Sequence, residues 1–293
     1  MRIGTHVTTA GIRPIADLRD DAAAAVARGL DSVWASQQVG GWDPLRLLPA
    51  LGDGPAELGT AIVPTYPQHP VTLATAALTV QSLAGGRLTL GIGPSHEWFV
   101  TRNLGLAYAS PARHTREYLE VLRPLLRGER VEHTGRFFTV DTGSVATGVP
   151  APPVLVAALG PRMLEVARDL ADGTVAVWVR PRTVAEHLVP ALHDGARVAA
   201  LVTVAITADP DGVRERFARD VAMVGELPAY RAVLDRGGLT GPADALVAGS
   251  EAVVLAELRR FRDAGLTDLI VTPHGTGPER ERVLDALAQL RVP

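Results

Sequence analysis

Hydrophobic residues in this chain form short apolar runs that alternate with helical patterns. Residues 58–98 show the pattern most clearly. An apolar run at 58–63 stops at Pro64, and a second run at 88–92 stops at Gly93-Pro94. Between them, apolar residues recur every three or four positions, with Pro70 suited to the first helical turn and Gly85-Gly86 to the helix end. The stretch predicts one strand–helix–strand unit with a right-handed crossover.

The same alternation continues along the whole chain. It predicts eight strands, at residues 3–7, 32–35, 58–63, 88–92, 154–158, 174–179, 197–207 and 269–272. It predicts helices at residues 15–27, 42–51, 70–84, 111–126, 161–171, 184–193, 213–234, 251–264 and 279–290, the helix at 213–234 interrupted near Gly225 and Pro228. Alternating strands and helices favour a parallel sheet covered by helices, and eight units favour a (β/α)₈ TIM barrel that forms one domain over residues 1–293.

A doubly wound sheet is the alternative fold. Its dinucleotide fingerprint G-x-G-x-x-G is missing, because the nearest text, Gly91-Ile92-Gly93, lacks the third glycine. Residues 129–152 depart from the alternation. There, runs at 130–133 and 137–140 flank Thr134-Gly135-Arg136, which predicts a hairpin inserted between strands four and five.

Composition narrows the class of protein. Of 293 residues, 47% are hydrophobic and 21% are charged, as in ordinary globular proteins. A net charge of -3 gives no reason to expect nucleic acid or an anionic membrane as a partner. No apolar run is long enough to span a bilayer, and a strand-like run opens the chain where a signal sequence would stand. We therefore expect a cytoplasmic protein.

Two residue types are missing. The chain has no cysteine, which excludes a thiol nucleophile, a thiolate metal site and a disulfide. It also has no lysine, since all 29 basic residues are arginine. The absence of lysine excludes Schiff-base chemistry, the usual pyridoxal-phosphate anchor and the P-loop lysine.

Polar residues gather just after the predicted strands, where the side chains of a barrel converge on one face. These positions are His6, Gln37, Gln38, Trp42, Tyr66, His69, Ser95, His96, Glu97, Gly160, Arg162, Trp178 and His274. No metal site is predicted, because His187 and His193 do not share a helical face. A carboxylate pair of Glu97 and Asp43 stays open, since no pattern sets the distance between them.

Two Gly/Pro turns are suited to an anion. Gly91-Ile92-Gly93-Pro94-Ser95 ends one strand, and Gly160-Pro161-Arg162 leads from another strand directly into a helix. Backbone N–H groups at such turns, together with the helix dipole, favour a phosphate. Ordinary strand-to-helix turns would have the same composition, so both interpretations stay open.

At these residues the sequence resembles the bacterial luciferase-like superfamily, and within it the F420 (deazaflavin)-dependent oxidoreductases of actinobacteria. The similar text is LGTAIVPTYPQHPVTLA, LAGGRLTLGIGPSH, PARHTREYLEVLRPLLRGERVEHTGRFFTV, PPVLVAALGPRMLEVA, ADGTVAVW and LPAYRAVLDRGG. The resemblance implies a TIM barrel with the cofactor ring at the C-terminal mouth. It also implies a non-proline cis peptide near Thr60-Ala61-Ile62 that backs the ring.

The resemblance further implies that phosphate and tail sites lie at Gly93, Pro94, Ser95 and His96 and at Gly160, Pro161 and Arg162. Trp178 would flank the ring. Many relatives carry an acidic residue and a histidine after the second strand, where this chain has Gln37-Gln38. Neither glutamine titrates, so the acid–base roles of that pair do not transfer, although Gln37 can still bond to the ring edge.

The expected reaction is hydride transfer between C5 of F420 and a C=N or C=C bond of a small organic substrate. Glu97, His96, His6 and His69 are the candidate proton donors, with histidine favoured by its ordinary pKa near neutrality. Gln38, Trp42, Tyr66 and Trp178 would line the substrate. The alternatives are an FMN-dependent monooxygenase and a non-catalytic barrel subunit. The resemblance also implies a homodimer.

Overall fold

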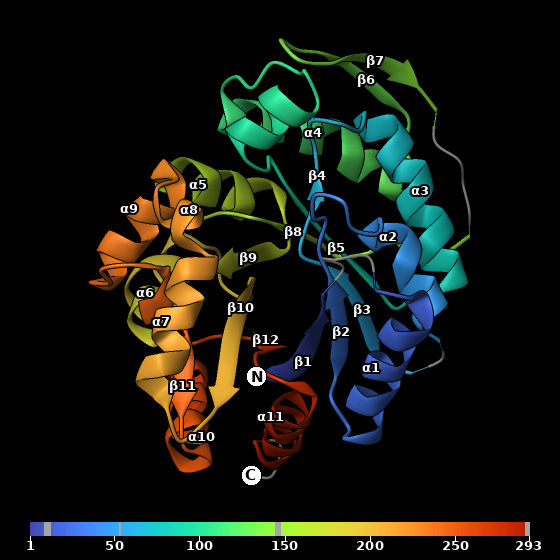
Figure 1. Cartoon of the computed structure of the whole chain (residues 1–293). Coiled ribbons are helices and arrows are strands. Elements are labelled where there is room, and N and C mark those ends of the chain that lie inside the picture. Colours follow the sequence, from blue (N-terminus) through green and yellow to red (C-terminus); the bar gives the residue numbers. More distant parts are fainter. Residues whose placement is uncertain (9–12, 53, 144–147, 291–293) are drawn as a thin grey trace.

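The protein is a closed parallel β-barrel surrounded by helices, as a computed structural model shows (Figure 1). The structure describes residues 1–8, 13–52, 54–143 and 148–290. The barrel strands are β1 (Arg2–Val7), β2 (Ser32–Ala35), β3 (Glu57–Thr60), β5 (Leu88–Gly93), β8 (Val154–Val156), β9 (Gly173–Val177), β10 (Arg197–Ile206) and β12 (Asp268–Pro273). They pair in that order, and β12 pairs in parallel with β1 to close the ring. The predicted TIM barrel is confirmed.

Two short strands depart from the prediction. The run predicted as one strand at 58–63 is divided, because β3 ends at Thr60 and β4 (Val63–Pro64) resumes the pairing with β5. The strand β11 (Val247–Gly249), which extends the sheet beside the far end of β10, was not predicted. Three residues are too few to show an alternating or apolar pattern that separates a strand from a loop.

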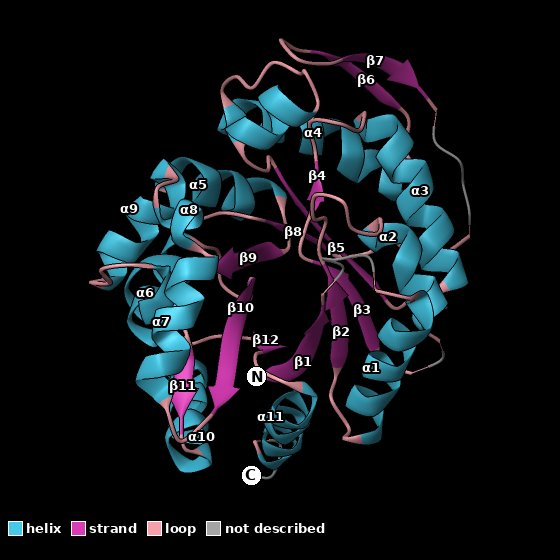
Figure 2. Cartoon of the chain, in the orientation of Figure 1, coloured by secondary structure: helices cyan, strands magenta, loops and turns pink. Residues whose placement is uncertain are grey.

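Helices cover the outside of the barrel (Figure 2). They are α1 (Ile15–Ala27), α2 (Pro44–Leu47), α3 (Pro70–Leu83), α4 (Pro111–Leu126), α5 (Pro161–Leu170), α6 (Pro181–Thr183), α7 (Pro210–Asp220), α8 (Ala222–Gly225), α9 (Pro228–Gly237), α10 (Glu251–Asp263) and α11 (Gly277–Gln289). Shorter turns are η1 (Leu48–Leu51), η2 (Phe99–Asn103), η3 (Val184–Leu188), η4 (Val189–Ala191) and η5 (Pro242–Ala245).

The predicted helix at 184–193 is wrong in type. It is a π-turn, η3, followed by a 3₁₀ turn, η4, in which Pro190 supplies no N–H for a regular α-helical bond. The predicted helix at 213–234 divides into α7, α8 and α9, as its glycine and proline interruptions suggested. None of the helices within the described part of the chain combines the length and apolar character needed to cross a bilayer.

The insertion between β5 and β8 contains an antiparallel hairpin of β6 (Val131–Thr134) and β7 (Thr139–Thr142). The predicted turn, Thr134-Gly135-Arg136, was placed too early. Thr134 pairs with Thr139, and Phe137 and Phe138 belong to the loop, where Phe138 packs against His114 and Tyr118. Both rings are half-buried against His114, and this packing overrides their preference for a strand. Residues 144–147 of the predicted insertion lie outside the described residues.

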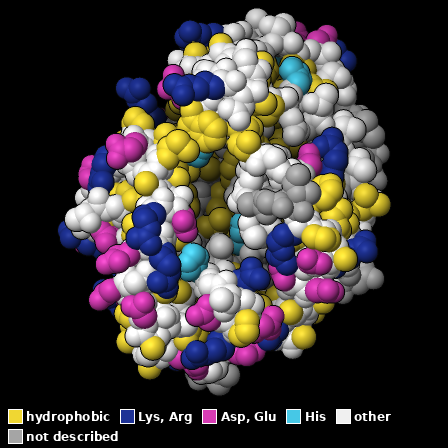
Figure 3. Space-filling model, viewed as in Figure 1, with side chains coloured by type: hydrophobic (Ala, Val, Ile, Leu, Met, Phe, Trp, Pro, Cys, Tyr) yellow, Lys and Arg dark blue, Asp and Glu magenta, His cyan; other side chains and the backbone are white. Residues whose placement is uncertain are grey.

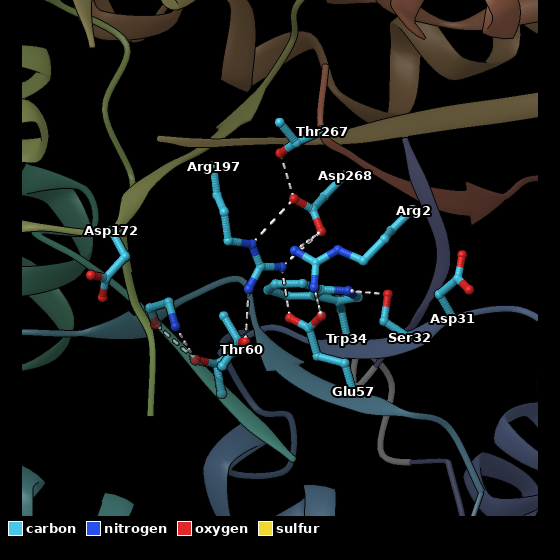
Figure 4. A network of polar contacts seen from close by, with 12 residues as sticks. Arg2, Asp31, Ser32, Trp34, Glu57, Thr60, Asp172, Arg197, Thr267 and Asp268 are labelled. Carbon is cyan, nitrogen blue, oxygen red and sulfur yellow. Dashed lines mark hydrogen bonds and ion pairs between the residues drawn. The ribbon is translucent and has the colours of Figure 1, made fainter. Parts of the chain in front are cut away.

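An ion network fills the N-terminal end of the barrel (Figure 4). Arg2, Glu57, Arg197 and Asp268 are the first residues of β1, β3, β10 and β12. Arg197 contacts Glu57 and Asp268 at 2.7 Å each, and Arg2 contacts the same two carboxylates at 2.7 and 2.8 Å. Above this layer, Trp34, Leu155, Val175, Ala199 and Ile270 form an apolar cluster. The barrel is therefore closed at one end, and a ligand has access from the other.

Candidate active site

The break between β3 and β4 forms a bulge at the C-terminal mouth of the barrel. The peptide bond between Ala61 and Ile62 is cis, as the resemblance implied. The hydroxyl of Thr60 replaces the missing strand pairing, because it accepts from the N–H of Gly91 and donates to its carbonyl, each at 2.8 Å. Gly91 has to be glycine here, since an added Cβ would lie 1.9 Å from the backbone carbonyl oxygen of Thr60.

His6 and Ser36 hold the bulge from the neighbouring strands. The Ser36 hydroxyl donates to the carbonyl of Ala61, and His6 Nε2 lies 2.8 Å from the same Ser36 oxygen. Because the single hydroxyl proton goes to a carbonyl, which only accepts, His6 Nε2 carries a proton and donates it. Burial lowers the pKa of His6 to about 4, so the ring is neutral at pH 7.

Three buried polar atoms at this mouth lack partners among the residues that the structure describes. They are His6 Nδ1 on β1, Gln38 Oε1 after β2 and Thr65 Oγ1 after β4. β1 pairs with β2, β2 pairs with β3, and β4 follows β3 after the bulge; each of the three atoms has a free lone pair. A buried polar group without a partner is costly, so such a group calls for a ligand or an ordered water. The beginnings of these three loops therefore suit a ligand with N–H or O–H donors.

His96 lies at the same mouth, after β5, the strand that pairs with β3 and β4. Its Nε2 is 3.1 Å from the hydroxyl of Tyr230 on α9. Trp178, after β9, packs edge-on against Tyr230 with ring centroids 6.1 Å apart. Ser95 and Trp178 both have a φ of 61°, in the left-handed region that non-glycine residues seldom adopt. Backbone outliers of this kind concentrate at functional sites.

A cavity of about 420 Å³ opens beside His96. Its lining includes Glu97, Trp98, Arg102 and Tyr108, and it is completed by Leu227, Pro228 and Ala229 at the start of α9. Glu97 is exposed in this cavity. Burial lowers the pKa of His96, which favours its neutral form.

A second cavity, of about 590 Å³, lies where α4 and α5 begin. Both helices start with proline, at Pro111 and Pro161, and neither N-cap residue forms a side-chain capping bond. Arg113 from α4 and Arg162 from α5 line the same cavity. Two uncapped helix N-termini and two guanidinium groups thus face one space, an arrangement that favours a bound anion.

Other predicted site residues have structural partners. Tyr66 stacks between Tyr108 and His114 and donates to the carbonyl of Ala109 at 2.8 Å. The His69 ring accepts from the N–H of Val71 at 3.3 Å and thereby caps α3. Trp42, with 37% of its surface exposed, donates to the carbonyl of Arg13 at 2.8 Å. Their predicted roles toward a ligand stay predictions.

The two predicted tail-site segments line different cavities. Ser95 and His96 belong to the cavity near α9, whereas Gly160, Pro161 and Arg162 share theirs with the start of α4. Gly93 packs closely, since an added Cβ would lie 2.8 Å from Ala157 Cβ. Sequence reasoning missed Arg113, Tyr108, Ser36 and Tyr230. The proline that opens each of α4 and α5 was a usable signal for Arg113, but no local pattern connects Tyr230 to His96.

The space-filling view shows a hollow in the middle of this face, with apolar side chains along its wall (Figure 3). A closed parallel barrel with a hollow, partly apolar mouth and helix N-termini that face a cavity is typical of proteins that bind a large cofactor. A family model described as luciferase-like monooxygenase matches residues 1–290. The chain therefore belongs to the luciferase-like monooxygenase family.

Two relatives and one solved structure show which enzymes this chain is similar to. A 5,10-methylenetetrahydromethanopterin reductase of Methanolobus tindarius is 25% identical and covers 94% of this chain and 95% of its own length. An F420-dependent glucose-6-phosphate dehydrogenase of Nakamurella multipartita is 29% identical, covering 92% and 89%. The solved structure of an F420-dependent secondary alcohol dehydrogenase with an F420–acetone adduct aligns over 99% of this chain and 97% of its own. Its TM-score is 0.80 and its identity is 19%.

Proposed function

We propose that this protein is an F420-dependent oxidoreductase that transfers a hydride between the deazaflavin and a C=N or C=C bond of a small organic substrate. The observation that carries the proposal is the pair of uncapped helix N-termini, at Pro111 and Pro161, that face one cavity with Arg113 and Arg162. F420 carries a phosphate and an acidic tail, and this is a site for several negative charges. The names of the relatives point to the same cofactor.

The residues at the mouth also fit a deazaflavin ring. His6 Nδ1 and Gln38 Oε1 are buried acceptors without partners among the described residues, and the ring edge of a deazaflavin carries N–H and O–H donors. The bulge at Thr60, Ala61 and Ile62 would back the ring. When bound, the cofactor supplies or accepts a hydride at C5.

The chain supplies the proton and the surroundings of the reaction. The carbanion or amide formed when a substrate accepts a hydride must take up a proton. His96, which lines the cavity beside α9, is the donor that the geometry favours. Glu97 lines the same cavity and is the second candidate. His6 is less suited, because its Nε2 proton already bonds to Ser36 and its pKa is about 4. Trp178 would exclude water from the ring.

Cofactor binding tests the proposal. Titration with F420 and with FMN, each oxidised and reduced, is expected to show F420 binding in the micromolar range or tighter, and FMN binding at least about tenfold weaker. Tight FMN binding without F420 binding would favour the monooxygenase alternative. Binding of neither cofactor would favour a non-catalytic barrel and would overturn the proposal.

A variant links the result to the helix cavity. We expect Arg162→Met to weaken F420 binding about tenfold, because one charge-assisted contact to the tail is lost. Arg168→Met is the matched control, since Arg168 lies on the same helix and pairs with Asp169. Equal affinities for the two variants would remove the cavity from the proposed cofactor site.

A further inference from the structure

His96 is held by a residue from a distant part of the chain. Tyr230 lies on α9, 134 positions later, and its hydroxyl is 3.1 Å from His96 Nε2. The two rings also meet edge to face, with centroids 5.1 Å apart at an interplanar angle of 72°. His96 also stacks with Trp98, with ring centroids 6.3 Å apart at an interplanar angle of 7°. The imidazole is therefore held by two ring contacts and one hydrogen bond.

The two ring nitrogens of His96 differ in their surroundings. Nε2 is occupied by Tyr230, whereas Nδ1 has no hydrogen-bond partner within the described part of the chain. His96 also lines the 420 Å³ cavity beside α9, together with Glu97, Arg102 and Tyr108, which are the other titratable or charged groups there. Nδ1 is thus the nitrogen left for a ligand.

A tyrosine hydroxyl is suited to a histidine that changes its protonation state. It can donate to a bare Nε2 of the neutral ring, and it can rotate to accept from Nε2–H of the imidazolium. A carbonyl could bond only to the protonated nitrogen. The hydrogen bond to Tyr230 therefore persists whether His96 has gained or lost a proton, and the ring keeps its orientation in both states.

We propose that Tyr230 is a positioning residue that holds His96 Nε2 in both protonation states, so that Nδ1 delivers a proton to the substrate. The inference rests on the proposed function. As the substrate carbon receives the hydride, the π electrons of its C=N or C=C bond move to the second atom. That atom takes the Nδ1 proton of the imidazolium. His96 is left for a moment as the neutral Nε2–H tautomer, with Tyr230 accepting. Exchange with water then returns a proton to Nδ1, and the resting neutral ring carries its proton on Nδ1 while Nε2 accepts from the Tyr230 hydroxyl.

The Tyr230→Phe variant tests this, because it removes the hydroxyl and keeps the ring packing. In protein labelled with ¹⁵N-histidine, with His96 assigned through loss of its signal in His96→Gln, neutral His96 in the wild type is expected to be mainly Nδ1–H. His96 Nε2 is the one acceptor for the Tyr230 hydroxyl proton among the described residues, so the hydroxyl favours a bare Nε2 and hence the Nδ1–H tautomer of the neutral ring. In Tyr230→Phe we therefore expect the Nδ1–H fraction to fall about twofold or more. An unchanged tautomer would overturn the proposal.

Tyr118→Phe is the matched control. The Tyr118 hydroxyl has no partner among the described residues, so its removal should leave the His96 signals in place. The same tautomer change in both variants would also contradict the proposal. With any C=N or C=C substrate that the wild type reduces, Tyr230→Phe should lower kcat about tenfold or more, with KM within about twofold.

Cofactor binding separates this inference from the proposed function. Tyr230→Phe is expected to bind F420 as the wild type does, within about twofold, because Tyr230 acts on the proton donor. If the wild type binds no F420, the proposed function fails, and the histidine spectra still decide whether Tyr230 selects the tautomer of His96. If F420 binds and the spectra of the two proteins agree, only the role of Tyr230 is refuted.

Discussion

At the scale of single residues, burial and partners decide what each histidine can do. His6 is buried, with one ring nitrogen bonded to Ser36 and the other without a partner among the described residues. His114 is buried among aromatic rings, stacked on Tyr66 with centroids 3.9 Å apart, and its Nδ1 has no partner among the described residues. The sequence treats all histidines alike, as groups that titrate near neutrality. The structure separates His6 and His114, whose rings are buried in the fold, from His96, which lines a cavity.

His114 makes stability depend on pH. Burial is the main cause that lowers its pKa from 6.5 to about 4, so between these values the unfolded chain binds a proton that the folded protein does not. Its contribution is complete above pH 6.5 and is lost as the pH falls toward 4. We expect His114→Phe to gain about 2 kcal/mol of unfolding free energy at pH 5 relative to its effect at pH 8. Urea unfolding at both values measures this.

Tyr118→Phe serves as the control for that experiment. Tyr118 packs against His114, and burial raises the pKa of its hydroxyl, which does not titrate between pH 5 and pH 8. Its effect on stability should be equal at the two pH values. A pH-independent effect of His114→Phe would show that His114 is protonated equally in the folded and unfolded chains.

At the scale of elements, the mouth depends on the close fit of the bulge to β5. Thr60 bonds to both backbone groups of Gly91, and Ile62 lies against Gly91 and Gly93. The apolar run at 58–63 predicts a strand but contains no local signal for where its pairing breaks. The resemblance, through the text of this stretch, placed the cis peptide correctly.

A glycine substitution tests this fit. Gly91→Ala would place a Cβ 1.9 Å from the Thr60 carbonyl oxygen, which is backbone and cannot rotate away. We expect a loss of about 3 kcal/mol or more in unfolding free energy. Gly277 lies at the exposed start of α11, where an added Cβ would meet no described residue within 4 Å apart from its chain neighbours and its own helix backbone. Gly277→Ala should change stability by less than about 1 kcal/mol. A loss in Gly91→Ala as small as that in Gly277→Ala would mean that β5 can move away from the bulge.

At the scale of the whole molecule, the two ends of the barrel have different tasks. The N-terminal end is closed by Arg2, Glu57, Arg197 and Asp268, whose two positive and two negative charges balance (Figure 4). The C-terminal end carries the bulge, the unpartnered polar atoms and the helix N-termini. This division, with stability at one end and chemistry at the other, is general among TIM barrels.

Removing one charge from the closed end should be costly. Arg197→Met leaves Glu57 and Asp268 buried with only Arg2, so we expect a loss of about 3 kcal/mol or more. Arg182→Met breaks the exposed pair with Glu186 and should cost less than about 1 kcal/mol. Thermal and urea unfolding measure both. Equal small losses would indicate that Arg2 alone compensates the two acids.

The sequence by itself determined the elements whose signal is local. Period and apolar runs predicted the eight barrel strands, most of the helices and the inserted hairpin, because each depends on a few consecutive residues. Only the tertiary structure decided the pairing of Tyr230 with His96, the meeting of α4 and α5 at one cavity, and the inward packing of Phe138. These features join residues tens to more than a hundred positions apart, and closure of the barrel, which no local pattern encodes, brings them together.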